Sequence, residues 1–268
     1  MGKNKVVLAG VPVETFFNRD EDGLICCVKG VEERYFPGRL EETLRKLEEE
    51  AKRSGFQVIN EGEIFVHHNT RHTGSYMGYE HQRLQPSYME IDFQDLFVRG
   101  KELRDKHKDA DRIICIGPSH LSALVLYEEN DFAARFDYHG DYYKSNKKCT
   151  SSGSSYASYM NAVEHRFHNI TVVNYGVKEQ EMDIFGKDCS DKDKGYQKAN
   201  HFDIDLDVFD AKYEMNGCRV KSNFQVETLL NMLHETKPRK IGVWEYREWH
   251  DRKNNALEFM KSILAVPF

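Results

Sequence analysis

Short apolar runs alternate with amphipathic helical segments along most of this 268-residue chain. The runs at 5–13, 112–116, 170–175 and 240–246 are rich in Val and Ile, the composition of strands that are buried on both faces. The segment 40–51 instead repeats its apolar residues at the spacing of one helical face. Repeated alternation of this kind predicts a mostly parallel central sheet with helices on both faces.

The remaining elements follow the same alternation. We expect further strands at 56–59, 133–137 and 201–207, and further helices at 93–109, 121–129, 158–167, 226–233 and 256–264. Residues 142–157 are expected to form a polar loop, and the charged stretch 178–200 a helix and a surface loop. Residues 60–95 show no pattern that assigns them to an element.

Length and composition favour a single soluble domain over residues 1–268. The chain is long enough for one large core, and no Pro-, Gly- or Ser-rich linker divides it. The net charge of −6 argues against a nucleic-acid partner, and no apolar stretch of about 18 residues predicts a membrane span. The six cysteines are scattered without a C-x-x-C pair and no secretion signal is evident, so we expect reduced thiols and a cytoplasmic location.

Metal-ligating residue types stand at three places where an expected strand ends. They are His120 after IICIGPS, then Asp137, His139 and Asp141 in DYHGD, then Asp203 and Asp205 in FDIDLD. Alternate residues of a strand point to the same side, and ligands of parallel sheets gather at the carboxyl ends of the strands. Carboxylate plus imidazole ligation suits manganese, iron or zinc better than calcium or magnesium. Four aspartates can also balance two divalent cations, so the pattern predicts a two-metal hydrolytic site.

Two neighbouring sets of residues need a separate interpretation. Asp207 continues the alternation of the Asp203 strand, and we interpret it as a supporting or capping acid rather than a ligand. His67, His68 and His72 also look metal-like, but adjacent histidines on a strand point to opposite faces. A substrate loop and plain surface exposure both stay open for these three histidines.

The motifs resemble the metal signatures of the ureohydrolases, the family of arginase and agmatinase. That family has a Gly-rich strand end carrying a His, then Asp-x-His-x-Asp, then Phe-Asp-x-Asp. Segments 116–120, 137–141 and 202–205 match them in the same order. The segment VWEYREWHD is similar to the family's late strand, whose Glu contacts a guanidinium-type substrate; this maps to Glu245, with Asp251 matching a later acid.

The resemblance implies a three-layer α/β/α, arginase-like fold and a binuclear centre of two Mn²⁺ per chain, with Zn, Fe or Co as other metals that would fit. Carried over to this chain, it gives one metal the ligands His120 and Asp141, the other metal His139 and Asp205, and both metals Asp137 and Asp203. A water between the metals would attack the trigonal carbon of a guanidinium or amidine. Asp141 would orient that water and pass its proton to the leaving amine, and Glu245 would offset the charge of the substrate.

Three departures from the family pattern bear on the substrate. Ser119 stands where the family has an Asp just before the first ligand His. The Asp-Pro pair that follows the Asp-x-Asp strand is absent, and Asp207 and Asp210 fall out of step with it. The loop SSGSSYASY lacks the family's His-Gly pair. In these respects the chain is similar to the divergent peptide arginases, which act on arginine side chains within a peptide.

The leading interpretation is a manganese hydrolase that cleaves a linear C–N bond of a guanidino or amidino compound, or of arginine in a peptide, and releases urea. Two alternatives stay open: a single-zinc deacylase on the same architecture, and a catalytically silent relative that binds metal. The paired aspartates favour two metals. Neither nucleic acid nor membrane is expected as a partner, and the resemblance is compatible with a homo-oligomer.

Overall fold

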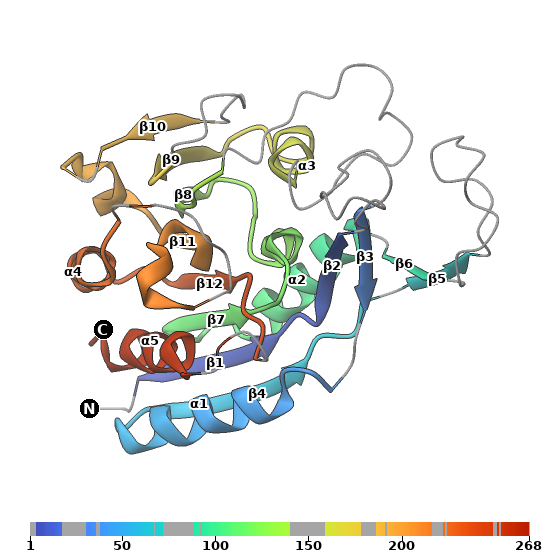
Figure 1. The fold of residues 1–268 in the computed structure, drawn as a ribbon, viewed down its shortest axis with the longest axis horizontal. Helices are drawn as coiled ribbons and strands as arrows, with labels where there is room; N and C mark the ends of the chain where they lie inside the picture. The colour runs from blue at the N-terminus through green and yellow to red at the C-terminus, as the bar shows by residue number, and fades with distance from the viewer. Residues whose placement is uncertain are drawn as a thin grey trace.

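The computed structural model centres on one eight-stranded sheet in which every neighbouring pair of strands is parallel (Figure 1). The structure describes residues 4–17, 31–35, 38–66, 68–71, 88–91, 93–139, 159–177, 186–190, 192–215, 222, 224–248, 251 and 253–267. The predicted parallel sheet and α/β class are confirmed.

The strand order is β10-β9-β8-β11-β12-β7-β1-β4. The strands are β1 (Lys5–Gly10), β4 (Gln57–Glu63), β7 (Arg112–Ile116), β8 (Phe132–Phe136), β9 (Thr171–Tyr175), β10 (Lys187–Cys189), β11 (His201–Asp205) and β12 (Lys240–Trp244). Every residue of β7, β11 and β12 is buried, because these central strands are covered on both faces. These three strands lie side by side, next to β8 in the middle of the sheet.

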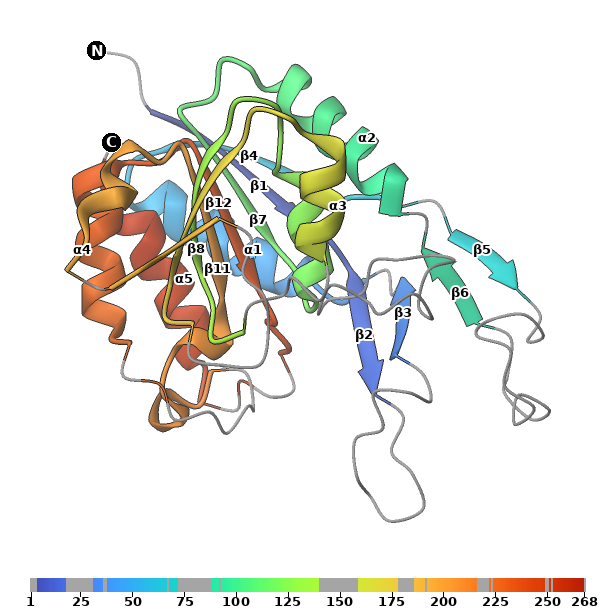
Figure 2. The same cartoon turned by 90° about the horizontal axis from the view of Figure 1, so that it is seen from above.

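Helices cover both faces of the sheet, and each layer encloses its own core (Figure 2). One layer holds α1 (Glu41–Arg53), α4 (Val226–Thr236) and α5 (Asn255–Ala265). The other holds α2 (Phe93–Lys106), α3 (Tyr159–Arg166) and the 3₁₀ helix η2 (His120–Val125). Alternate residues of β1 divide between the cores: Val6 and Leu8 pack with the first layer, Val7 and Ala9 with the second.

Two small antiparallel pairs stand beside the main sheet (Figures 1 and 2). They are β2 (Val13–Phe17) with β3 (Val31–Tyr35), and β5 (His68–Arg71) with β6 (Tyr88–Ile91). The single strand predicted over 5–13 is therefore wrong at its end, because β1 closes at Gly10 and Val13 already pairs with Tyr35 in another sheet.

Three other predicted elements differ from the observed ones. The helix predicted over 121–129 is the shorter 3₁₀ helix η2, which Ser119 begins by accepting a hydrogen bond from the Leu121 amide. The charged stretch 178–200, predicted as a helix and a surface loop, contains in its described part the edge strand β10 and the short 3₁₀ helix η4 (Lys194–Lys198). The strand predicted over 201–207 ends at Asp205, where the 3₁₀ helix η5 (Leu206–Val208) begins.

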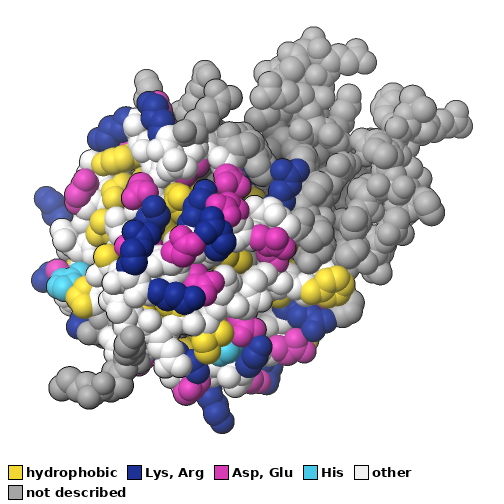
Figure 3. All heavy atoms as spheres, turned by 90° about the horizontal axis from the view of Figure 1, so that it is seen from below, with side chains coloured by type: hydrophobic (Ala, Val, Ile, Leu, Met, Phe, Trp, Pro, Cys, Tyr) yellow, Lys and Arg dark blue, Asp and Glu magenta, His cyan; other side chains and the backbone are white. Residues whose placement is uncertain are grey.

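Charged side chains of both signs are interspersed over the face drawn in Figure 3. Basic and acidic groups alternate there, with small apolar areas between them. Such a surface carries no large field of one sign on the part of this face that the structure describes. Among the described residues, no helix is both long and apolar enough to cross a membrane.

Candidate metal centre

The candidate site lies at the carboxyl ends of four neighbouring strands. His120 follows β7, Asp137 follows β8, Asp205 closes β11 and Glu245 follows β12. These strands are adjacent in the order β8-β11-β12-β7, so the four residues lie at the same end of the sheet although more than a hundred positions separate some of them. All four side chains are buried. The predicted placement of polar groups at this edge follows from the parallel topology.

The first group of candidate ligands consists of His120, Asp137 and Asp205. Nδ1 of His120 lies 3.1 Å from Oδ2 of Asp137 and 3.0 Å from Oδ2 of Asp205. One donor atom from each residue lies within 4.8 Å of the others, a spacing that could hold a metal ion. An imidazole nitrogen and two carboxylate oxygens converge here in the interior of the protein.

The second group consists of Asp137, His139 and Asp207. Nδ1 of His139 lies 2.7 Å from Oδ2 of Asp207 and 3.8 Å from Oδ1 of Asp137. Asp207 is buried, whereas the side chain of His139 is 36% exposed. Asp137 belongs to both groups, and its two oxygens face different histidines. The arrangement is therefore a pair of sites joined by one carboxylate, with the second site open to solvent at His139.

Asp203 belongs to neither group, although the sequence pattern predicted it as a metal ligand together with Asp205 and the family resemblance implied that it bridges both metals. Its carboxylate instead faces the Nε2 side of His120, together with the hydroxyls of Tyr127 and Tyr159. Asp203 lies apart from the two groups because of the point at which the strand ends. Asp203 is still inside β11, one pleat below its end, whereas Asp205 accepts a hydrogen bond from the Asp207 amide and turns the chain into η5. That turn brings Asp207, interpreted from the sequence as a supporting acid, up to His139.

The carboxylates of the two groups carry more negative charge than their surroundings balance. Burial raises the pKa of Asp205 well above its usual value, and the charge of Asp207 raises it further. Burial and then the charge of Asp137 raise the pKa of Asp207. Burial also acts to raise the pKa of Asp137, but the charges of Arg135 and His120 outweigh it and hold this pKa well below its usual range. A divalent cation would supply the missing positive charge.

Arg135 is a buried cation beneath the site that the sequence analysis did not single out. Its guanidinium donates hydrogen bonds to the Asp137 carboxylate, to the backbone oxygen of His139 at 3.0 Å and to the Tyr159 hydroxyl at 2.9 Å. It also donates to Asn174 at 3.3 Å. An Arg in the middle of the apolar strand FAARF was the available signal, because a buried guanidinium needs a partner. The contacts fix Asp137 between the two groups.

Glu245 turns its strand end toward the site in an unusual backbone conformation. Its φ of +60° lies in the left-handed region that residues other than Gly seldom adopt. The next amide, that of Tyr246, donates to the backbone oxygen of Gly117 at 3.1 Å and ties the bend to the end of β7. Burial raises the pKa of Glu245, the Arg247 guanidinium opposes that rise, and the charge of Asp207 adds to it. Glu245 therefore lies within electrostatic reach of the candidate ligands.

Asp251 caps the start of the last helix, α5. Its two carboxylate oxygens accept the backbone amides of Ala256 and Leu257, each at 3.0 Å, in the first turn of α5. A side chain that pairs these otherwise unsatisfied amides stabilises the start of a helix. The role shown by these contacts is a helix cap.

Several residues singled out in the sequence lie outside the described residues. They are Asp141, the loop 142–157, His67, His72 and the side chain of His68. Their predicted roles stay predictions.

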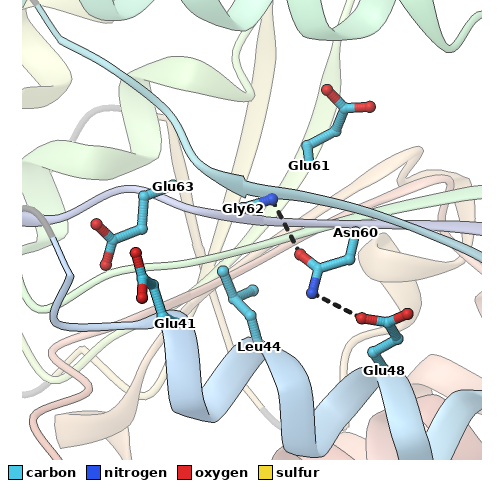
Figure 4. Close-up of a pocket in the computed structure, with 7 residues that line it drawn as sticks. All are labelled: Glu41, Leu44, Glu48, Asn60, Glu61, Gly62 and Glu63. Carbon is cyan, nitrogen blue, oxygen red and sulfur yellow. Dashed lines mark hydrogen bonds between the residues drawn. The ribbon is translucent and has the colours of Figure 1, made fainter.

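A surface groove of about 460 Å³ between α1 and β4, away from the candidate ligands, is lined largely by acids (Figure 4). Three of its four carboxylates, those of Glu48, Glu61 and Glu63, have partners within the fold. Glu63 accepts the backbone amides of Gly38 and Leu40 before α1, and Glu48 accepts the side-chain amide of Asn60. These contacts hold α1 on the edge strand, so we assign the groove a structural role.

The fold is similar to that of solved structures named as an arginase, an agmatinase and an amidino hydrolase. An arginase from Bacillus caldovelox is 14% identical, with 99% of this chain and 98% of that chain covered and a TM-score of 0.63. A hypothetical agmatinase from Burkholderia thailandensis is 12% identical over 98% of this chain and 84% of that chain, with a TM-score of 0.65. The proclavaminate amidino hydrolase from Streptomyces clavuligerus is 12% identical over 98% and 90% of the two chains, with a TM-score of 0.59.

No family model matches the sequence, and no curated protein matches it. Likeness at 12–14% identity over nearly the whole chain is a likeness of fold. The resemblance to ureohydrolases that the three motifs predicted is confirmed at that level. The protein has the arginase-like α/β fold shared by these arginase, agmatinase and amidino hydrolase structures.

Proposed function

We propose that this protein is a divergent ureohydrolase, a metal-dependent hydrolase that cleaves a linear C–N bond of a guanidino or amidino substrate. One observation carries the proposal: two groups of carboxylate and imidazole donors share Asp137 at the carboxyl edge of an arginase-like sheet. Paired sites of this kind suit hydrolytic chemistry at a trigonal carbon, because two cations can serve the nucleophile and the reacting group together.

The donor set fits a divalent transition metal. Each group offers one imidazole nitrogen and two carboxylates, a mixture that favours Mn, Fe, Co or Zn over the oxygen-only preference of Ca or Mg. We propose two Mn²⁺ per chain, with His120 and Asp205 on one side of Asp137 and His139 and Asp207 on the other. Cations held there would lower the pKa of a bound water toward neutrality and so supply a nucleophile.

The remaining residues prepare the site for a cationic substrate. Glu245 is the proposed contact for the guanidinium, because it is a carboxylate at the same edge and its backbone is held in a fixed, strained bend. The substrate is proposed to enter beside His139, the partly exposed member of the two groups. Asp141, two positions beyond His139, remains the proposed carrier of the proton to the leaving amine.

The first experiment measures metal content and urea release together on the full chain purified with added manganese. The substrates are arginine, agmatine, guanidinobutyrate and arginine-containing peptides. We expect two manganese per chain and urea from at least one compound. We expect the Asp137→Asn variant to lose the bound manganese and the urea release. A chain that binds no divalent metal contradicts the proposal. One zinc per chain with release of acyl groups from acylated lysine peptides would instead support the deacylase alternative.

A further inference from the structure

Asp203 is a buried carboxylate whose two oxygens each receive two polar contacts. At Oδ1, the Trp244 indole Nε1 donates at 2.6 Å and Nε2 of His120 lies 3.2 Å away. At Oδ2, the hydroxyls of Tyr127 and Tyr159 donate at 2.6 Å and 2.7 Å. An ionised carboxylate has about four lone-pair positions in total; the indole and the two hydroxyls donate to three of them, and Nε2 of His120 faces the fourth. Its oxygens are therefore committed to this network rather than to a cation.

His120 lies between Asp203 and the candidate site. Its Nε2 lies 3.2 Å from Oδ1 of Asp203 and 2.9 Å from the Tyr159 hydroxyl, which donates its own proton to Asp203 and can therefore accept from Nε2. Its Nδ1 faces Asp137 at 3.1 Å and Asp205 at 3.0 Å. An imidazole that binds a metal is neutral and carries one proton, and the nitrogen without the proton is the one that binds. An acceptor at Nε2 keeps the proton there and presents the lone pair of Nδ1 to the site.

The position just before His120 does not supply this acceptor. The ureohydrolase pattern has an Asp there, whereas this chain has Ser119, whose hydroxyl accepts the Leu121 amide at 3.3 Å and caps η2. A carboxylate next to a ligating imidazole orients the ring and raises its basicity, so its loss weakens metal binding. In this chain a carboxylate reaches the same imidazole from the neighbouring part of the sheet.

We propose that Asp203 is a positioning residue for His120 and not a metal ligand. It replaces, from strand β11, the carboxylate that Ser119 cannot provide. Tyr159 extends the network, because its hydroxyl also accepts from Arg135, which holds Asp137. One buried network thus fixes both His120 and Asp137. The inference rests on the proposed function in one respect: it requires a divalent cation at the His120 group.

The test measures the affinity of the full chain for Mn²⁺ by calorimetry and by the electron paramagnetic resonance signal of free Mn²⁺. Asp203→Asn keeps the shape of the side chain and removes its charge. We expect this variant to bind the first Mn²⁺ about 10- to 100-fold more weakly than the wild type. An unchanged affinity overturns the inference.

Tyr127→Phe separates positioning from ligation by the sign of its effect. It removes only the hydroxyl that donates to Oδ2 of Asp203. If Asp203 positions His120, the loss of this donor loosens the network and weakens Mn²⁺ binding by a smaller factor than Asp203→Asn. If Asp203 were a ligand, the same change would free a lone pair for the metal and tighten binding. Tighter binding therefore overturns the proposal.

A spectroscopic readout reports on His120 directly. In protein labelled with ¹⁵N-histidine and loaded with Zn²⁺, the imidazole shifts identify the nitrogen that binds metal and the nitrogen that holds the proton. We expect Nδ1 bound and Nε2 protonated in the wild type, and a partial loss of this preference in Asp203→Asn. Metal on Nε2 in the wild type overturns the inference.

Asp131→Asn is the matched control for loss of a buried acid. Asp131 is as buried as Asp203. It precedes β8 at the amino ends of the strands, where it pairs with Lys240. We expect a lower melting temperature with Mn²⁺ affinity unchanged to within about twofold. A wild type that binds no metal would overturn this inference and the proposed function together. A wild type that binds metal, with an Asp203→Asn variant of equal affinity, would overturn this inference alone.

Discussion

The guanidinium of Arg247 lies 3.4 Å from the carboxylate of Glu245, and about nine-tenths of each side chain is buried. Glu245 is the proposed contact for a substrate guanidinium, so a group of the same chemistry from the protein already stands beside it. The two cations would compete for one carboxylate. The contact therefore predicts that Arg247 weakens the binding of a guanidinium at Glu245.

Replacing Arg247 with Gln should strengthen the binding of guanidinium substrates. Loss of a partly buried ion pair worth about 1 kcal/mol corresponds to roughly a fivefold fall in KM. The charge of Arg247 opposes the rise that burial gives to the pKa of Glu245, so this pKa should rise further in the variant. KM should therefore be measured at alkaline pH, where Glu245 stays ionised.

The control for this change is Arg53→Gln, because Arg53 is an exposed residue at the end of α1. It should leave KM unchanged, and Glu245→Gln should raise it. A KM that stays constant or rises in Arg247→Gln would show that Arg247 does not compete with the substrate.

The number of metals per chain should follow the two groups that share Asp137. At saturating manganese, Asp205→Asn and Asp207→Asn should each reduce the content from two ions to one, and Asp137→Asn should remove both, because only Asp137 belongs to both groups. Elemental analysis after gel filtration measures this. Asp210→Asn is the control, since its carboxylate accepts the Lys212 amide on the same segment.

Adding Asp203→Asn to these variants decides between two possible pairs of metal ligands after β11. If Asp207→Asn keeps two ions while Asp203→Asn loses one under saturating metal, the ligands are Asp203 and Asp205, as the sequence pattern alone suggested. The structure favours the pair one pleat further along the chain, because η5 carries Asp207 to His139.

The central sheet could be predicted because its strands are buried on both faces and read as continuous apolar runs. The strand predicted over 112–116 is β7 with the same bounds, and β9 and β12 differ from prediction by no more than two residues at either end. Once these strands are parallel, the meeting of His120, Asp137 and Asp205 follows, because adjacent carboxyl ends share one edge.

The assignment of Asp203 and Asp207 could not be read from the sequence in the same way. The alternation predicts that Asp203, Asp205 and Asp207 would point to the same face of a strand, but it does not show at which residue the strand ends. That point depends on a local turn, in which Asp205 accepts the Asp207 amide. The groups that contact Asp203 come from residues up to 83 positions away in the chain, and only the tertiary structure brings them together.

Removing the cap of the last helix should cost stability without changing the metal site. Asp251→Ala leaves the amides of Ala256 and Leu257 without their side-chain acceptor, which should lower the free energy of unfolding by about 1–2 kcal/mol. Urea unfolding measures this. Asp251→Asn should recover most of the loss, because Asn also caps helices. An alanine variant as stable as the wild type would mean that the start of α5 is held by packing alone.

The buried ion pair of Asp131 and Lys240, at the amino ends of the strands, should make the free energy of unfolding depend on pH in the acid range. Burial acts to raise the pKa of Asp131, but the imidazole of His201, whose Nδ1 lies 3.6 Å away, and the ammonium of Lys240 outweigh it and lower the pKa from 3.8 to about 2. The lowered pKa corresponds to about 2 kcal/mol of stabilisation that is fully present above the unfolded value. It is lost as the pH falls through the folded value, with about half gone by pH 3. Asp131→Asn lacks this term, so the difference in unfolding free energy between wild type and variant should narrow from pH 6 to pH 3 in urea titrations. Asp109→Asn, at an exposed pair with Lys5, should show little difference at any pH. A gap for Asp131→Asn that stays constant with pH would show that its carboxylate is not held ionised by its partners.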